Sequence, residues 1–150
     1  KKFYLKFVSA FEFKMKRFFE ITIFALLVTT LAACSNDADS KAIEKIQTFY
    51  RRHIFGDEFA NDSVMVKYCT KELAQKLRDD YDNEYSDEGG YAVWKFRSNA
   101  QAGEDIQEVE KIESLGDGRY IVHYNDMGNK GTHTITTVIQ DGEIFFDKLD

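Results

Sequence analysis

The chain has 150 residues, of which 43% are hydrophobic and 31% are charged, with no proline and two cysteines. This length and mixture fit one folded domain and exclude collagen, a proline-rich linker and a disulfide-stapled mini-protein. A membrane protein with several helices is also excluded, because only one segment is apolar enough to consider.

The N-terminal part carries the pattern of a secretory signal peptide. Met15 is followed by the basic pair Lys16 and Arg17 and then by an apolar run over residues 21–33. A basic start, a short apolar core and small residues before a cleavage point are typical of such leaders. The run is shorter than the ~20 residues of a membrane-spanning helix. We expect translation to start at Met15, with a longer basic n-region that includes residues 1–14 as the alternative. In either case residues 1–33 should be absent from the mature protein.

The apolar run ends in Leu31, Ala32, Ala33 and Cys34, which resemble the lipobox of bacterial lipoproteins at all four positions. The resemblance implies signal-peptidase recognition of the first three residues, cleavage before the cysteine and acylation of Cys34, for example with palmitate. Each buried methylene contributes about 0.8 kcal/mol, so two or three acyl chains anchor a protein to a membrane. The alternative is a buried signal-anchor helix with a chance cysteine.

The mature chain from Cys34 would carry 14 basic and 24 acidic residues, a net charge of −10. An acidic surface repels nucleic acid and anionic lipids. We therefore expect no nucleic-acid partner, and a membrane contact through the lipid on Cys34.

Residues 34–40 are polar and predict a tether. Their acidic residues resemble the surface-export signal of Bacteroides-type lipoproteins, with an ordinary linker as the alternative. The expected location is the bacterial cell envelope, at the outer membrane, with surface exposure left open.

Two helices are expected after the tether. Lys41–Phe55 has apolar residues at helical spacing, with Asp39 or Ser40 as its N-cap and Gly56 at its end. A second helix is capped by Thr70 and runs to about Glu84. Cys69, between them, can form no internal disulfide once Cys34 is lipidated, and we expect a buried structural thiol.

The second half predicts four short strands: Gln107–Leu115, Arg119–Asn125, Thr132–Gln140 and Glu143–Leu149. Asp117-Gly118 and Asp141-Gly142 are favoured in two-residue hairpin turns, and residues 127–131 predict a longer turn. The domain, residues 41–150, is therefore α+β, with N-terminal helices packed on a curved four-stranded antiparallel meander.

Strand alternation assigns the faces of this sheet. Tyr120, Val122 and Tyr124 should share one face of their strand. In the last strand, Phe146 should face the helices and Phe145 should lie on the opposite face.

Four segments carry a further resemblance: Ala42–Tyr50, Tyr68–Leu77, Tyr91–Gln101 and Ile144–Leu149. In them the chain is similar to an uncharacterised family of Bacteroides-type lipoproteins. The element order resembles the cystatin-like and nuclear-transport-factor-two-like superfamily. The lipoprotein family often has an aspartate directly after the glutamine, where this chain has Ala102.

Enzymes of that superfamily, such as ketosteroid isomerase and scytalone dehydratase, place an aspartate base or an Asp–His pair in a cone between sheet and helices. The candidates here are His53, His123, His133, Asp126 and Asp147. His53 lies on an apolar helix face, which is typical of a core-edge histidine, and His123 and His133 should be exposed. No motif joins these residues, so the sequence predicts no enzyme, no cofactor and no metal.

Asp79–Glu88 is the densest acidic run. A calcium loop beginning at Asp80 would need glycine at its sixth position, where Tyr85 stands. The run therefore predicts a solvated acidic helix end.

Aromatic residues cluster after this run. Trp94 and Phe96 should enter the core, whereas Tyr81, Tyr85 and Tyr91, together with His53, are candidates for a ligand or partner surface. The sequence thus favours a lipid-anchored envelope protein whose domain binds an unidentified ligand or protein. A small isomerase-like or dehydratase-like enzyme with a cone-shaped pocket, and an envelope-complex accessory or toxin inhibitor, stay open as alternatives.

Overall fold

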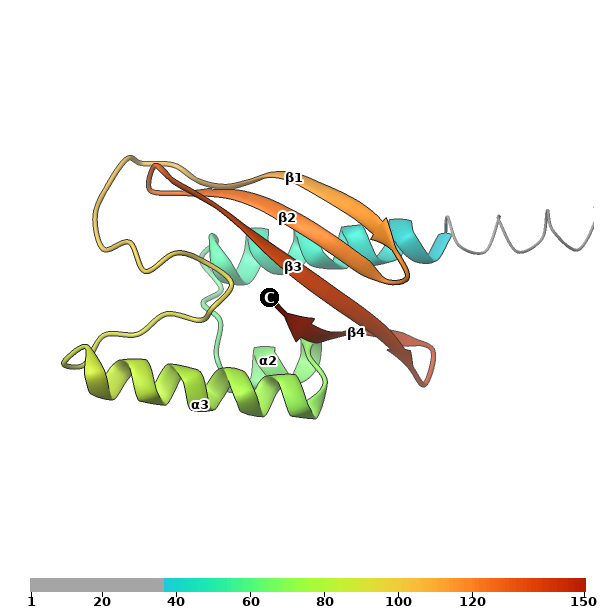
Figure 1. Ribbon diagram of the computed structural model, residues 1–150, viewed down its shortest axis with the longest axis horizontal. Coiled ribbons are helices and arrows are strands. Elements are labelled where there is room, and N and C mark those ends of the chain that lie inside the picture. Colours follow the sequence, from blue (N-terminus) through green and yellow to red (C-terminus); the bar gives the residue numbers. More distant parts are fainter. Residues whose placement is uncertain (1–36) are drawn as a thin grey trace, which may run out of the picture. The chain divides into compact units, whose positions relative to one another are not determined.

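The computed structural model describes residues 37–150, of which Asp39–Asp150 form one unit of the fold. The predicted leader and the predicted lipobox, with Leu31, Ala32, Ala33 and Cys34, lie outside the described residues. In the described part, helices come first and a four-stranded antiparallel sheet follows (Figure 1), which confirms the predicted α+β class. A search of residues 37–150 finds no helix of the length and hydropathy needed to span a membrane.

The first helix turns one apolar face to the core. It runs through residue 49 and ends in a π-helical turn, η1 (Tyr50–Ile54). Ile46, Phe49 and Tyr50 are fully buried, as their helical spacing predicts. The helix already includes residues 37–40, so the tether predicted over 34–40 is wrong for these four residues.

Asp39 binds the sheet instead of capping the helix. Its carboxylate accepts hydrogen bonds from the Tyr120 hydroxyl at 2.8 Å and from the Ser114 hydroxyl at 3.0 Å. The prediction that Asp39 or Ser40 forms the N-cap is therefore wrong, because the helix begins earlier and the Asp39 oxygens face the strands.

The helix ends before Gly56, as predicted, but for a different reason. Phe55 N donates to the Tyr50 carbonyl at 2.8 Å and closes the π turn. A Cβ atom on residue 56 would lie 2.2 Å from the Arg51 carbonyl oxygen. Close backbone approach, and not a left-handed conformation, requires glycine there.

Two further helices follow. α2 (Asp62–Tyr68) was not predicted, and it begins where the Asn61 side chain accepts from Val64 N at 3.1 Å. α3 (Lys71–Asp87) begins as predicted, with the Thr70 hydroxyl accepting from Leu73 N at 3.4 Å. It extends beyond Glu84, through most of the acidic run.

The strands are β1 (Gln107–Gly116), β2 (Arg119–Asp126), β3 (Asn129–Gln140) and β4 (Glu143–Leu149), in the order β1-β2-β3-β4. All four expected strands and both Asp-Gly turns are confirmed, with positive φ at Asp117 and Asp141. Met127 and Gly128 also have positive φ and form a third two-residue turn, because Asp126 already pairs with Asn129. The longer turn predicted over 127–131 is wrong.

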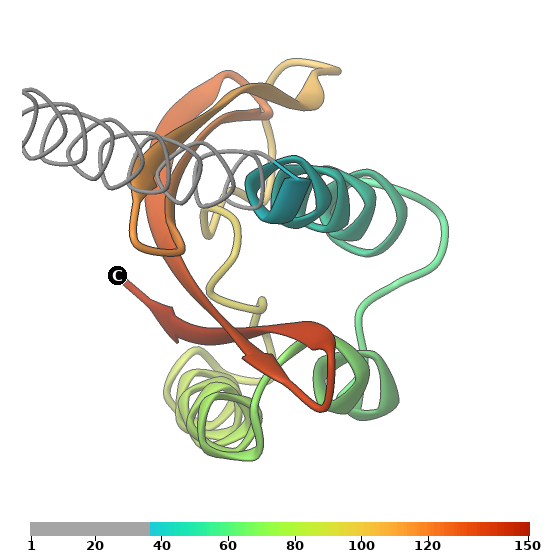
Figure 2. The same ribbon diagram turned by 90° about the vertical axis from the view of Figure 1, so that its right-hand side faces the viewer.

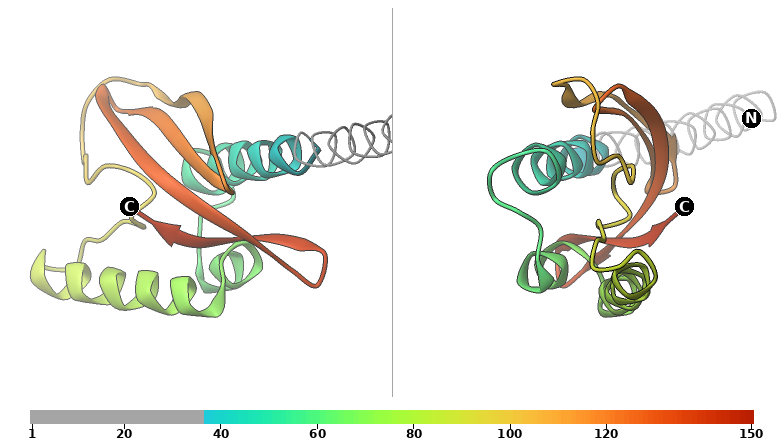
Figure 3. Two further views of the ribbon diagram at one scale, coloured as in Figure 1. Left: turned by 45° about the vertical axis from the view of Figure 1, so that its right-hand side comes forward. Right: turned by 90° about the vertical axis from the view of Figure 1, so that its left-hand side faces the viewer.

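The sheet curves around the first helix, and α2 and α3 lie along β4 (Figures 2 and 3). The connection between α2 and α3 pairs with β4, since Thr70 N donates to the Phe146 carbonyl at 2.8 Å. That edge of the sheet is therefore partly covered by the chain itself.

Aromatic rings fill the space between helix and sheet. The Phe49 ring lies 4.7 Å from Phe96, 4.9 Å from Tyr68 and 5.3 Å from Phe146, measured between ring centroids. Phe49, Phe96 and Phe146 are fully buried. Tyr120, Val122 and Tyr124 face the same interior, as the strand alternation predicts.

The two neighbouring phenylalanines of β4 test the register. Phe146 is fully buried, whereas Phe145 lies opposite Val138 and is half-buried beside the Lys45 amine. Phe146→Ala should lower the free energy of unfolding by about 3–5 kcal/mol, and Phe145→Ala by clearly less. Urea unfolding of the full chain measures both losses of free energy. A larger loss in Phe145→Ala would mean that the register of β4 is shifted by one residue.

Candidate functional site

An open pocket of about 220 Å³ lies between η1, the loop that follows it, α3 and the segment before β1. The lining residues are His53, Ile54, Phe59, Ala60, Tyr81, Ala92, Val93, Trp94 and Arg97. Two of the predicted candidates, His53 and Tyr81, thus meet in one place, although they are far apart in the sequence.

Trp94 and Tyr81 form an aromatic wall of this pocket. Their ring centroids lie 5.0 Å apart, and the Trp94 indole Nε1 donates to the Ala60 carbonyl at 3.1 Å. The Arg78 guanidinium lies over both rings, 4.9 Å from the Trp94 centroid. These contacts fix the wall in position before any ligand arrives.

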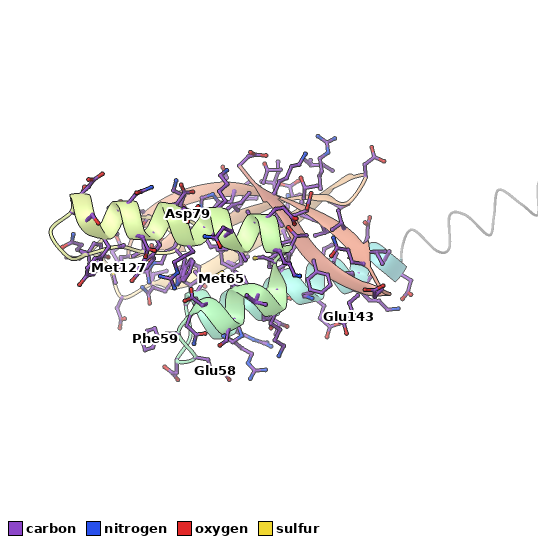
Figure 4. All side chains as sticks on the ribbon, turned by 90° about the horizontal axis from the view of Figure 1, so that it is seen from below. Glu58, Phe59, Met65, Asp79, Met127 and Glu143 are labelled. Atoms are coloured by element: carbon purple, nitrogen blue, oxygen red, sulfur yellow. The ribbon has the colours of Figure 1, made fainter. Side chains whose placement is uncertain are left out.

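Phe59 forms the rim. Its side chain is 80% exposed and projects from the loop in Figure 4. His53 supports that loop from inside, because its Nδ1 donates to the Glu58 carbonyl at 2.8 Å while its ring packs 5.4 Å from Tyr68. On the outside, Arg52 forms an ion pair with the Glu58 carboxylate and lowers its pKa. His53 is thus the core-edge histidine that the helical pattern predicts.

Arg97 lies at the floor, and a buried carboxylate holds it there. Its guanidinium donates to both oxygens of Asp126, at 2.8 and 3.1 Å. Asp126 is fully buried and also accepts from the Ser98 hydroxyl at 2.6 Å and from the Gln107 amide at 3.3 Å. With its oxygens engaged by these donors, Asp126 acts as an anchor for this segment and not as a free base.

The other base candidates do not join this site. His133 was expected to be exposed, and this is wrong: it pairs with Val122, shares the interior face and stacks on Tyr124 at 5.2 Å. Burial lowers its pKa. His123 lies on the opposite face, where its Nε2 donates to Glu113 at 2.9 Å. Asp147 is half-buried on β4.

The other two candidate tyrosines, Tyr85 and Tyr91, do not line the pocket with Tyr81. Tyr85 is half-exposed on α3, and the Tyr91 hydroxyl donates to the Ala100 carbonyl at 3.4 Å, so neither lines the pocket. Trp94 and Phe96 are buried, as expected. Cys69 is buried too, and burial raises the pKa of its thiol to about 12, which keeps it protonated at neutral pH.

A second opening, of about 260 Å³, is lined by Gln47, Arg51, Phe55, Gln107, Glu108 and Val109. Most of these side chains are polar, and none is a predicted site residue. The first pocket is the stronger candidate, because it joins apolar walls to a few polar groups. In the part of the chain that the structure describes, no group of three or more His, Cys, Asp or Glu residues could hold a metal ion.

Sequence reasoning missed Phe59 and Arg97. A signal for Phe59 was present, since it is a lone aromatic residue in the polar stretch from Gly56 to Asn61. Arg97 gave none, because its role depends on Asp126, which lies 29 residues away in the chain.

Comparisons with protein-family models, curated proteins and solved structures found no match.

The contacts of Asp126 with Arg97, Ser98 and Gln107 should contribute to the stability of the fold. Asp126→Asn removes the charge that balances Arg97 and replaces one acceptor oxygen with a donor. Breaking a buried ion pair on one side costs about 3–5 kcal/mol. The control is Glu113→Gln, which removes the carboxylate that pairs with Lys111 and His123 at the surface and should cost clearly less. Urea unfolding compares the two, and equal losses would contradict the anchoring role.

Proposed function

We propose that this protein is a lipid-anchored lipoprotein of the bacterial cell envelope whose α+β domain binds a ligand or partner in the pocket at Trp94. The anchor rests on the match of Leu31, Ala32, Ala33 and Cys34 to the lipobox and on the apolar run before them. The proposed fold relationship is to the cystatin-like superfamily. It is supported by the order of helices before a curved antiparallel sheet.

One observation carries the binding role: an aromatic wall already held in place faces an open pocket with an exposed phenylalanine at its rim. Phe59 is 80% exposed, although burying such a ring contributes about 1.5–3 kcal/mol. Because it stands at the rim of a formed pocket, the Phe59 ring is placed to cover an apolar or aromatic group that enters there.

The contents of the interior argue for binding over catalysis. An isomerase-like enzyme needs an open cone with a carboxylate or imidazole in it. Here Phe49, Phe96 and Phe146 occupy the space between helix and sheet, and Asp126 is engaged by Arg97. The binding role is accordingly preferred to the enzyme alternative.

The anchor is tested by labelling. In cells that carry the gene, Cys34→Ala should abolish the incorporation of a fatty-acid analogue and leave a longer, unprocessed chain. The matched control is Cys69→Ala, which removes the other cysteine and should keep the label. Equal labelling of wild type and Cys34→Ala would contradict lipidation.

The pocket is tested through its tryptophan. Trp94 is the only tryptophan of the chain, so the protein gives one indole N–H signal in NMR, from the group that donates to Ala60. Titration with p-cresol and 3-methylindole, neutral analogues of aromatic side chains, should shift this signal in a saturable way. Phe59→Ala should weaken the binding. The control Ile139→Ala removes another exposed apolar side chain, on β3, and should leave the binding unchanged.

An indole signal that stays in place up to the solubility limit of both probes would overturn the binding role. So would an equal response in wild type and Phe59→Ala, because the probe would then lie elsewhere.

A further inference from the structure

The size of the pocket limits what can enter it. Small-molecule and cofactor sites usually enclose about 300–1,000 Å³, whereas this pocket has about 220 Å³ and opens to solvent. A single large side chain fits this space better than a whole cofactor. The aromatic wall of Trp94 and Tyr81 suits a ring, which can pack edge-on or offset against it.

Four cationic side chains around the pocket form ion pairs with acidic side chains. The pairs are Arg52 with Glu58, Arg78 with Asp62 and Asp82, Lys95 with Asp80, and Arg97 with Asp126. Arg97 therefore lines the pocket with a planar guanidinium whose charge is balanced by the buried Asp126 carboxylate. Such a plane stacks on aromatic rings without attracting a second anion.

The charge left over near the pocket is negative. Asp57 stands two residues before Phe59 on the rim loop and is exposed. From Asp79 to Trp94 the chain has six acidic residues and no basic one, and Asp87 and Glu88, also exposed, end this stretch of α3. Among residues 37–150, no basic side chain pairs with Asp57, Asp87 or Glu88.

We infer that the pocket receives an aromatic side chain from a basic segment of a partner protein. This deepens the proposed function and rests on it. The ring would enter between Phe59 and the wall of Trp94 and Tyr81, while lysines or arginines beside it face Asp57 and the acidic end of α3. The same carboxylates repel nucleic acid and anionic lipid headgroups, so charge complementarity selects a cationic peptide.

The experiment uses three pentapeptides, with four lysines around a central phenylalanine, four glutamates around a phenylalanine, and four lysines around an alanine. The full chain, purified in a nonionic detergent, is titrated at low salt and followed by the Trp94 indole signal. The lysine–phenylalanine peptide should bind about tenfold or more tighter than either of the others. Its affinity should fall as salt is raised, because exposed charges are screened.

Two matched variants separate charge from shape. Asp57→Asn combined with Asp87→Asn should weaken binding of the lysine–phenylalanine peptide and leave binding of p-cresol unchanged. The control, Asp141→Asn combined with Glu143→Gln, removes as many charges from the β3–β4 hairpin, which lies well away from Phe59 in Figure 4, and should change neither.

The outcomes distinguish the two proposals. If p-cresol binds but the lysine and glutamate peptides bind equally, the inference fails and the binding role stands. If the lysine–alanine peptide binds as tightly as the lysine–phenylalanine peptide, the acidic surface alone is responsible and the pocket takes no ring. If neither p-cresol nor any peptide moves the indole signal, both proposals fail.

Discussion

One buried carboxylate determines where the pocket can be. The segment between α3 and β1 has no regular secondary structure, so it lacks the repeated backbone hydrogen bonds that position a helix or strand. Asp126, at the end of β2, replaces them by accepting from Arg97, Ser98 and Gln107. A buried charge is costly unless it is paired, so the arrangement of this segment in which Arg97 binds Asp126 is favoured. Trp94, three residues before Arg97, is placed by the same constraint.

The backbone near Asp126 strengthens this arrangement. Glu104 N donates to the Met127 carbonyl at 3.0 Å, and a Cβ atom on Gly103 would lie 2.0 Å from that same oxygen. The irregular segment therefore closes directly onto the β2–β3 turn, and only glycine permits the approach. One wall of the pocket is thus carried by the sheet, while the rim comes from the loop after η1. A substitution at the β2–β3 turn should therefore change the position of Trp94.

The sequence predicted the regular elements well and the site poorly, for a physical reason. Strand alternation and Asp-Gly turns are local signals, and they predicted the four strands and the faces of β2 and β4. The wrong start predicted for β3 also has a local cause. Met127-Gly128 is not a typical turn pair, so the strand was predicted to begin at Thr132 and His133 was predicted to be exposed. The pocket, in contrast, depends on contacts between distant residues. His53 and Tyr81 were named separately, but nothing in their spacing said that they would meet.

The charge distribution around the pocket favours a cationic partner. Acidic residues without a basic partner repel one another and lower the stability of the folded state. Around the pocket, Arg52, Arg78, Lys95 and Arg97 are each bound to an acidic side chain and do not offset the remaining negative charge. The fold therefore holds an excess of negative charge beside an exposed ring, two features that are both unfavourable in the free protein. A cationic, aromatic segment relieves both at once. Long-range attraction would raise its rate of association, and burial of its ring would set the lifetime of the complex. Binding of this kind would be reversible and sensitive to salt, because its attraction comes from exposed charges that added ions screen.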